Sequence, residues 1–73
     1  MRVNGQALRA IRERSGYSIR GLAAEAGVAK STISAIEQGD RPVPLPATIR
    51  ALASALLVPT TALLDSYEED NNG

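Results

Sequence analysis

The sequence predicts an all-α domain built from five short helices. Apolar residues recur at intervals of three and four along most of the chain, as they do on one face of a helix, and no segment alternates as a strand would. At 73 residues the chain has room for one core only. Because it has two Tyr, no Trp and no Phe, that core must be filled by Leu, Ile, Val and Ala in closely packed helices.

Polar residues and a glycine bound the first two helices. The first is expected over residues 4–14, with Asn4 as its N-cap. Ser18 is placed to cap the second helix, which has the sequence IRGLAAEA, and Gly27 ends it. The boundaries of both helices therefore follow from local hydrogen-bonding chemistry.

Three further helices are expected after these. The third runs from about residue 30 to residue 38 and ends at Gly39. The proline-rich stretch DRPVPLP then interrupts the pattern, and Pro46 suits the first turn of a fourth helix. The fourth helix carries the apolar residues Ile49, Leu52, Ala53 and Leu56. The segment VPTTALLD predicts a short fifth helix, which closes the core with Leu63 and Leu64.

Composition argues against several classes of function. The chain has no Cys and no His, so disulfides, thiol chemistry, zinc sites and imidazole catalysis are not expected. It has no phosphate-cradling glycine loop and no carboxylate pair in an evident pocket, which predicts no enzyme activity, no cofactor and no small-molecule ligand. No apolar run approaches the roughly 20 residues of a membrane span, and the N-terminus lacks the apolar core of a signal peptide. We therefore expect a cytoplasmic protein with no membrane contact.

Charge divides the chain into two parts. Residues 1–64 hold eight basic and four acidic side chains, a net charge of +4, whereas residues 65–73 hold four acidic side chains and no basic one. This predicts a mildly basic domain over 1–64 and an acidic, disordered tail over 65–73. The tail is expected to be solubilising, and the alternative is that it competes with an anionic partner for the basic part.

The segment AGVAKSTISAIEQG, residues 26–39, has the composition of a helix with one buried face and one exposed face that contacts a partner. Two helices that cross near a right angle after a short turn need a small residue at the crossing, a glycine in the turn and an aliphatic anchor in the second helix. Ala23, Gly27 and Ile33 supply these three. The remaining face is short and polar enough to enter a groove, and it carries Lys30, Ser31, Ser34, Ala35 and Gln38.

Residues 4–64 resemble the Cro/C1-type helix-turn-helix domain of phage repressors and of xenobiotic-response-element regulators. The most specific part is LAAEAGVAKSTISAIEQG, which follows the family pattern L-A-x-x-A-G-V-x-x-x-x-I-S-x-I-E-x-G. The resemblance implies a compact, five-helix, lambda-repressor-like domain whose third helix enters the DNA major groove. It also implies a sequence-specific DNA-binding regulator, most simply a repressor of the phage immunity or Cro type, with double-stranded DNA as its partner.

The resemblance implies a role for several positions. Those that read base edges are Lys30, Ser31, Ser34 and Ala35, the last as an apolar contact for a thymine methyl. Those that lie near the DNA backbone are Ser18, Arg20, Thr32, Gln38 and Arg41. A buried ion pair between the first and third helices is formed by Arg12 and Glu37. The helices of the motif pack through Ala23, Gly27 and Ile33.

The chain departs from the family pattern at three informative positions. Ile19 stands where a phosphate-binding Gln is usual, and Arg20 is the candidate to replace it. Ala29 stands where a Ser or Thr usually caps the third helix, a loss of about 1 kcal/mol of helix stability. Leu57 replaces the glycine that commonly follows the fourth helix, so it either packs or is exposed. An exposed Leu57 would suit a dimer contact.

Three functions remain open from the sequence. The first is a small repressor that acts as a homodimer on DNA, with a contact predicted at Leu57, Leu63 and Tyr67 and with weak dimerisation in solution. The second is an antitoxin or a recombination accessory protein that binds DNA together with a protein partner. The third is a protein-interaction module on the same fold. Gel shifts at moderate salt separate the first two from the third.

Overall fold

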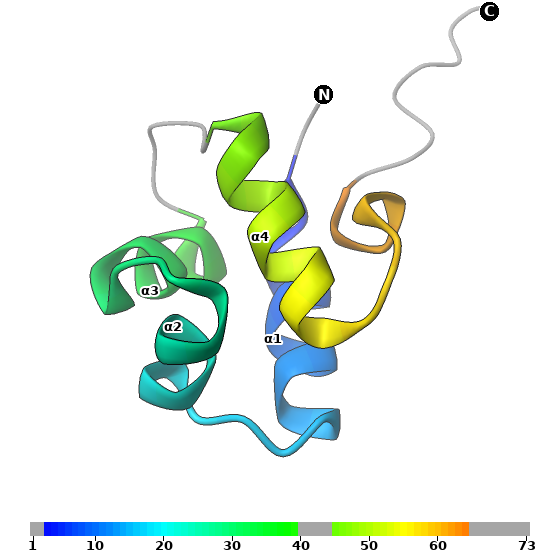
Figure 1. Cartoon of the computed structure of the whole chain (residues 1–73). Coiled ribbons are helices and arrows are strands. Elements are labelled where there is room, and N and C mark those ends of the chain that lie inside the picture. Colours follow the sequence, from blue (N-terminus) through cyan, green and yellow to red (C-terminus); the bar gives the residue numbers. More distant parts are fainter. Residues whose placement is uncertain (1–2, 40–44, 65–73) are drawn as a thin grey trace, which may run out of the picture.

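The computed structural model describes residues 3–39 and 45–64, which form four α-helices and one turn of 3₁₀ helix (Figure 1). These elements are α1 (Gly5–Arg14), α2 (Ile19–Ala26), α3 (Lys30–Gln38), α4 (Pro46–Leu56) and the 3₁₀ turn η1 (Thr60–Leu63). The described residues contain no strand, and the prediction of an all-α domain is confirmed. Three of the predicted features, Arg41, Tyr67 and the acidic tail at 65–73, lie outside the described residues.

The prediction of five helices is wrong at its last element. In place of a fifth α-helix there is only η1, with Pro59 as its N-cap and Leu64 already extended after it. Leu64 forms an antiparallel bridge with Val3, and the Asn4 N–H donates to the Leu63 carbonyl at 2.8 Å. Backbone pairing with the N-terminal segment therefore takes the chain out of the helical conformation after a single turn.

Side-chain caps fix the start of two helices as the sequence predicts. Asn4 Oδ1 accepts a hydrogen bond from the Ala7 N–H at 3.0 Å, which sets the start of α1. Ser18 Oγ accepts from the Gly21 N–H at 2.9 Å and sets the start of α2. The N-cap of α3 is Ala29, which makes no side-chain cap hydrogen bond. The first turn of α3 is thus held by packing and backbone geometry rather than by a cap.

Three helices end at a residue with positive φ. Gly27 ends α2 with φ 74° and Gly39 ends α3 with φ 80°, where glycine carries no steric penalty. At the end of α4 this position is taken by Leu57, with φ 61°. The Leu57 N–H still donates to the Ser54 carbonyl and the Val58 N–H to the Ala53 carbonyl, so the helix end is closed by hydrogen bonds. The side chain of Leu57 is 90% exposed.

Replacing Leu57 with glycine is expected to raise the free energy of unfolding by about 0.5–1 kcal/mol. Glycine removes the strain of a left-handed leucine, and this gain exceeds the entropy that glycine adds to the unfolded chain. Little burial is lost, because the side chain is exposed. Thermal unfolding followed by circular dichroism should show a higher midpoint. Leu57→Ala is the matched control, since it removes the side chain and keeps the strain; an equal gain in both variants contradicts this account.

The core lies where the four helices and η1 meet. α1 packs against α3 and η1, α2 packs against α3 and α4, and α4 packs against η1. The buried apolar residues come from all five elements: Leu8, Leu22, Ala23, Ile33, Ile36, Ile49, Leu52, Ala53, Leu56 and Leu63. Leu63 has no exposed surface, so the prediction that it takes part in a dimer contact is wrong. Its side chain is needed inside the core.

The start of α1 lies directly against the end of α3. A Cβ added to Gly5 would collide with the Ile36 carbonyl oxygen and would also crowd the backbone of Glu37. A side chain at this position would therefore force the two helices apart. The contact fixes the distance between α1 and α3 independently of side-chain packing, and so helps to fix the position of α3 on the domain.

Candidate functional site

The turn between α2 and α3 is rigid and closely packed. Both the Gly27 N–H and the Val28 N–H donate to the Ala23 carbonyl, at 2.9 and 3.1 Å. Ala23 is buried at the contact of α2 with α3, and Ile33 of α3 is completely buried. Of the three residues that the sequence singled out for packing, Gly27 is hydrogen-bonded to Ala23, and Ala23 and Ile33 belong to the same buried core. The orientation of α3 relative to α2 is set by the core.

The opposite face of α3 is turned toward solvent and carries short polar side chains. Lys30, Ser31 and Gln38 are exposed, whereas Thr32, Ser34 and Ala35 are half-buried. All of the predicted base-reading residues therefore lie on α3. Two of them, Ser34 and Ala35, are expected from the sequence to point outward but are less exposed than that expectation requires. The accessible groups at the N-terminal end of α3 are the ammonium of Lys30 and the hydroxyl of Ser31.

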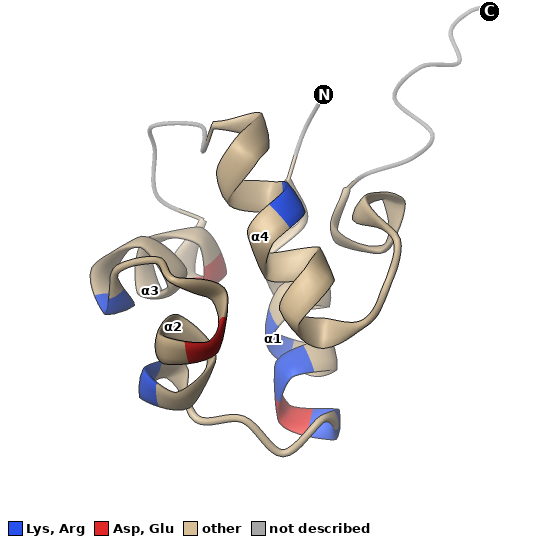
Figure 2. Ribbon diagram, viewed as in Figure 1, with Lys and Arg blue, Asp and Glu red and all other residues tan. Residues whose placement is uncertain are grey.

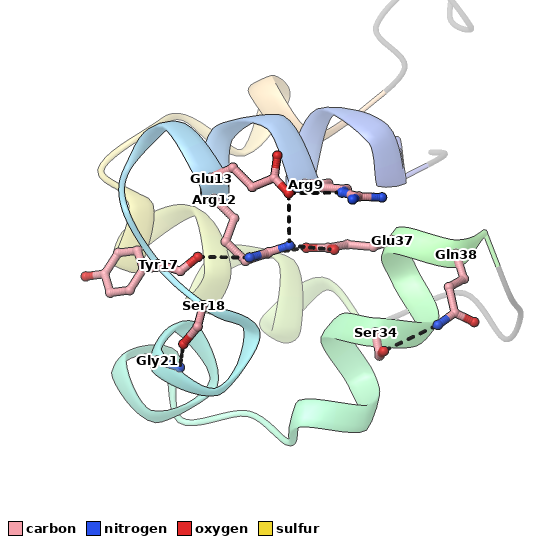
Figure 3. Close-up of polar contacts among 9 residues, drawn as sticks. All are labelled: Arg9, Arg12, Glu13, Tyr17, Ser18, Gly21, Ser34, Glu37 and Gln38. Atoms are coloured by element: carbon pink, nitrogen blue, oxygen red, sulfur yellow. Dashed lines mark hydrogen bonds and ion pairs between the residues drawn. The ribbon is translucent and has the colours of Figure 1, made fainter.

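An ion pair between Arg12 and Glu37 joins α1 to α3 (Figure 3). Arg12 Nε donates to Glu37 Oε2 at 2.6 Å and Arg12 Nη2 donates to Glu37 Oε1 at 3.1 Å, a bidentate arrangement. Arg12 Nη1 also donates to the Tyr17 carbonyl at 2.9 Å. The two side chains are 9% and 7% exposed. One guanidinium therefore holds α1, the segment that leads into α2, and α3 in a fixed arrangement.

Electrostatics keep this guanidinium charged. The hydrogen bond to Glu37 raises the pKa of Arg12, and it outweighs burial, which acts in the opposite direction. Because the pKa of Arg12 is raised, the stabilisation that its charge provides is fully present at neutral pH and is lost as the pH rises through the raised value. Glu13 Oε2 lies 3.1 Å from Arg9 Nε and 3.8 Å from Arg12 Nη2, but the side chains of Arg9 and Glu13 are 65% and 55% exposed, so these contacts contribute little.

The residues predicted near the DNA backbone come from different elements. Ser18 and Arg20 are exposed at the start of α2, and the Ser18 oxygen is engaged with a backbone N–H of its own helix. Gln38, at the end of α3, donates from Nε2 to Ser34 Oγ at 3.4 Å (Figure 3). The structure therefore joins a predicted backbone contact to a predicted base contact. Their spacing of four residues on a helix could have signalled this pair from the sequence.

Charged residues are spread over all four helices rather than gathered on one (Figure 2). The described residues include six basic and three acidic side chains, a net charge of +3. Within this part of the chain, the basic side chains that take part in no ion pair are Arg14, Arg20, Lys30 and Arg50. An anionic partner would therefore contact a few basic side chains on different helices and not one continuous basic patch.

Other kinds of site find little support in the described part of the chain. A shallow hollow of about 310 Å³ lies between the start of α1 and the end of α3, and its lining includes Asn4, Gly5 and Gln38. Among the described residues, no group of three or more His, Cys, Asp or Glu side chains is placed to hold a metal ion. None of the helices described is long and apolar enough to cross a membrane.

Comparison with known proteins gives a consistent result. A family model described as "Helix-turn-helix domain" matches residues 5–66. The HTH-type transcriptional repressor RghR of Bacillus subtilis (strain 168) is 47% identical over 60 residues, which are 82% of this chain and 44% of that protein. The chain thus spans less than half the length of this relative.

Two solved structures superpose well on this chain. The restriction-modification controller protein C.AhdI from Aeromonas hydrophila gives a TM-score of 0.75 at 37% sequence identity and covers 82% of this chain and 89% of that one. SinR of Bacillus subtilis, a master regulator of biofilm formation solved in complex with DNA, gives a TM-score of 0.79 at 36% identity. This match covers 84% of the present chain and all of the SinR chain.

Proposed function

Because this chain belongs to the helix-turn-helix domain family, we propose that it is a sequence-specific DNA-binding regulator of transcription, and most simply a repressor. The family resemblance that the motif around Ala23 and Ile33 predicts is confirmed. The supporting relatives are named as transcriptional regulators, and one structural neighbour was solved on DNA. The proposed activity is binding and not catalysis.

One observation carries the proposal. The inward face of α3 is locked into the core by Ile33 and Ile36, while its outward face presents an exposed Lys30 and several hydroxyl groups. A helix held in this way can enter the major groove as a rigid body, with its N-terminal residues against base edges. We assign Lys30, Ser31, Ser34 and Ala35 to the bases, and Ser18, Arg20 and Thr32 to phosphates. Arg41 is assigned to phosphate from the family pattern alone.

Selection of bound sequences from a random DNA pool tests the proposal directly. Lys30→Ala should relax the preference at one base pair per half-site, because a lysine ammonium donates to guanine O6 and N7 and such a contact discriminates by about 1–3 kcal/mol. Arg50→Ala removes the same charge from α4 and should leave the selected sequence unchanged. If Lys30→Ala lowers affinity for selected and random DNA by the same factor, α3 does not read bases through this residue.

Binding is also expected to depend on salt to a moderate degree. With five or six groups on phosphates, Arg20 and Arg41 among them, the logarithm of affinity should fall against the logarithm of salt concentration with a slope of roughly −4 to −6 per protomer. Arg41→Ala should reduce this slope by about one and weaken all sequences alike. The measurement is a salt titration of binding to one duplex. A slope near zero is incompatible with DNA as the partner and would favour a protein-interaction module.

We further propose that two copies bind DNA as a symmetric dimer. One reading helix covers only a few base pairs, so specificity usually requires two half-sites about one helical turn apart. With Leu63 buried in the core, Leu57 is the described residue best suited to the contact, because a large apolar side chain lies almost fully exposed there. Footprints on selected sequences test this: two half-sites in inverted repeat are expected, and a single asymmetric half-site bound by one protomer excludes the dimer.

A further inference from the structure

On the outward face of α3, a residue predicted to contact the DNA backbone is hydrogen-bonded to a residue predicted to contact a base. Gln38 Nε2 donates to Ser34 Oγ across one turn of the helix, at 3.4 Å. Figure 3 shows the Gln38 amide turned back along α3 toward the hydroxyl. Residues four apart lie on the same side of a helix, so Lys30, Ser34 and Gln38 form one row along α3. We call these three residues the polar row.

The hydrogen bond decides which group Ser34 offers to a partner. A serine hydroxyl has one hydrogen to donate and two lone pairs to accept with. In this structure Gln38 takes up a lone pair, and Ser34 Oγ donates to no other group among the residues described. The hydrogen and one lone pair of Ser34 therefore remain, and the hydrogen is the favoured group, because an oxygen that already accepts a hydrogen bond becomes a stronger donor. Ser34 is also half-buried, which limits the directions in which that hydrogen can point.

From this contact we infer that Gln38 is a positioning residue, which makes Ser34 a hydrogen-bond donor toward the DNA bases. The inference rests on the proposed function and refines it, because it says to which base edges Ser34 can donate a hydrogen bond. In the major groove, acceptors are presented by guanine O6 and N7, adenine N7 and thymine O4, whereas cytosine presents only an amino donor. Ser34 thus selects against cytosine on the strand that it faces. Gln38 acts on this choice through Ser34 and not through a phosphate of its own.

A double-mutant cycle measures the coupling. Affinities for the selected duplex are compared among the wild type, Ser34→Ala, Gln38→Ala and the double variant. Each single change should lower affinity about five- to tenfold. The double variant should lose no more affinity than Ser34→Ala does, because both changes remove the same contact between Ser34 and a base. Ser34→Ala combined with Arg20→Ala, which lies on α2, is the control pair, and its losses should multiply.

The base preference of the protein distinguishes a positioning role of Gln38 from a purely structural one, because a structural role would leave the preferred sequence unchanged. Ser34→Ala and Gln38→Ala should relax the selected sequence at the same base pair. Gln38→Glu keeps the length of the side chain but can only accept, so it turns the Ser34 hydrogen away from the groove and should abolish the bias against cytosine there. Thermal unfolding should be nearly unchanged in Gln38→Ala, since that side chain is exposed.

The outcomes separate the inference from the function on which it rests. If the wild type selects a DNA sequence but the losses of Ser34→Ala and Gln38→Ala multiply, or if they relax different base pairs, the positioning role of Gln38 is overturned and the proposed function stands. If the wild type selects no sequence at all, the proposed function itself fails, and the inference fails with it.

Discussion

Replacing Glu37 with alanine is expected to lower the free energy of unfolding by about 3–5 kcal/mol, a large part of what a domain of this size possesses. Arg12 then loses both of its hydrogen bonds to the carboxylate, at a position where its side chain is only 9% exposed in the wild-type structure. An arginine cannot escape by deprotonation, so a buried charge is left without its partner. Urea and thermal unfolding of the purified variant measure the loss.

Two further variants show whether the loss comes from the unpaired charge. Glu13→Ala removes a carboxylate that lies 3.8 Å from Arg12 and is 55% exposed, and it should cost less than about 0.5 kcal/mol. A combined Arg12→Met and Glu37→Leu replacement should recover most of the stability that Glu37→Ala loses, because no buried charge remains. If Glu37→Ala costs no more than Glu13→Ala, the buried pair does not hold α1 to α3.

Replacing Ile33 with alanine is expected to cost about 2–5 kcal/mol and to abolish binding to all DNA sequences alike. Ile33 is completely buried where α3 packs against the core, so the change leaves a cavity beneath α3. The effect on binding comes through folding, and it should therefore be the same for selected and random duplexes. Unfolding curves and gel shifts on the same preparation measure the two effects together.

A smaller change at the same position should lower the stability of the domain by a smaller amount. Ile33→Val removes one methylene and should cost about 0.5–1.5 kcal/mol, with binding retained under conditions where the variant is folded. Lys30→Ala is the opposite control, because it lies on the exposed face of α3 and should change binding without changing stability. If Ile33→Ala unfolds no more readily than the wild type, the packing of α3 on the core is not what fixes the motif.

Features set by neighbouring residues are those that the sequence predicts well. Asn4 and Ser18 cap helices because each side chain reaches a backbone N–H three residues on. Gly27 and Gly39 end helices because glycine reaches positive φ at no cost, and Pro46 stands at the start of α4. These local rules give the starts of α1, α2 and α4 and the ends of α2 and α3.

What the sequence does not predict depends on residues far apart in the chain. The fifth element stops after one 3₁₀ turn because Leu64 pairs with Val3, and no local pattern announces that partner. The hydrogen bond from Arg12 to the Tyr17 carbonyl cannot be predicted either, because every residue has a backbone carbonyl and the sequence does not show which one accepts. The pairing of Arg12 with Glu37 follows from the family resemblance only, because their spacing in the sequence gives no signal of it.

The pairing of Val3 with Leu64 has a consequence for synthesis in the cell. The first helix is complete once Arg14 has been added, but the Leu63 carbonyl that receives the Asn4 N–H and the Leu63 side chain that fills the core are made about 50 residues later. Chains grow at about 5–20 residues per second, so α1 waits several seconds on the ribosome for its last partner. Until then α1 can pack against α3 but not against η1, so folding of this domain finishes only after residue 64 has been made.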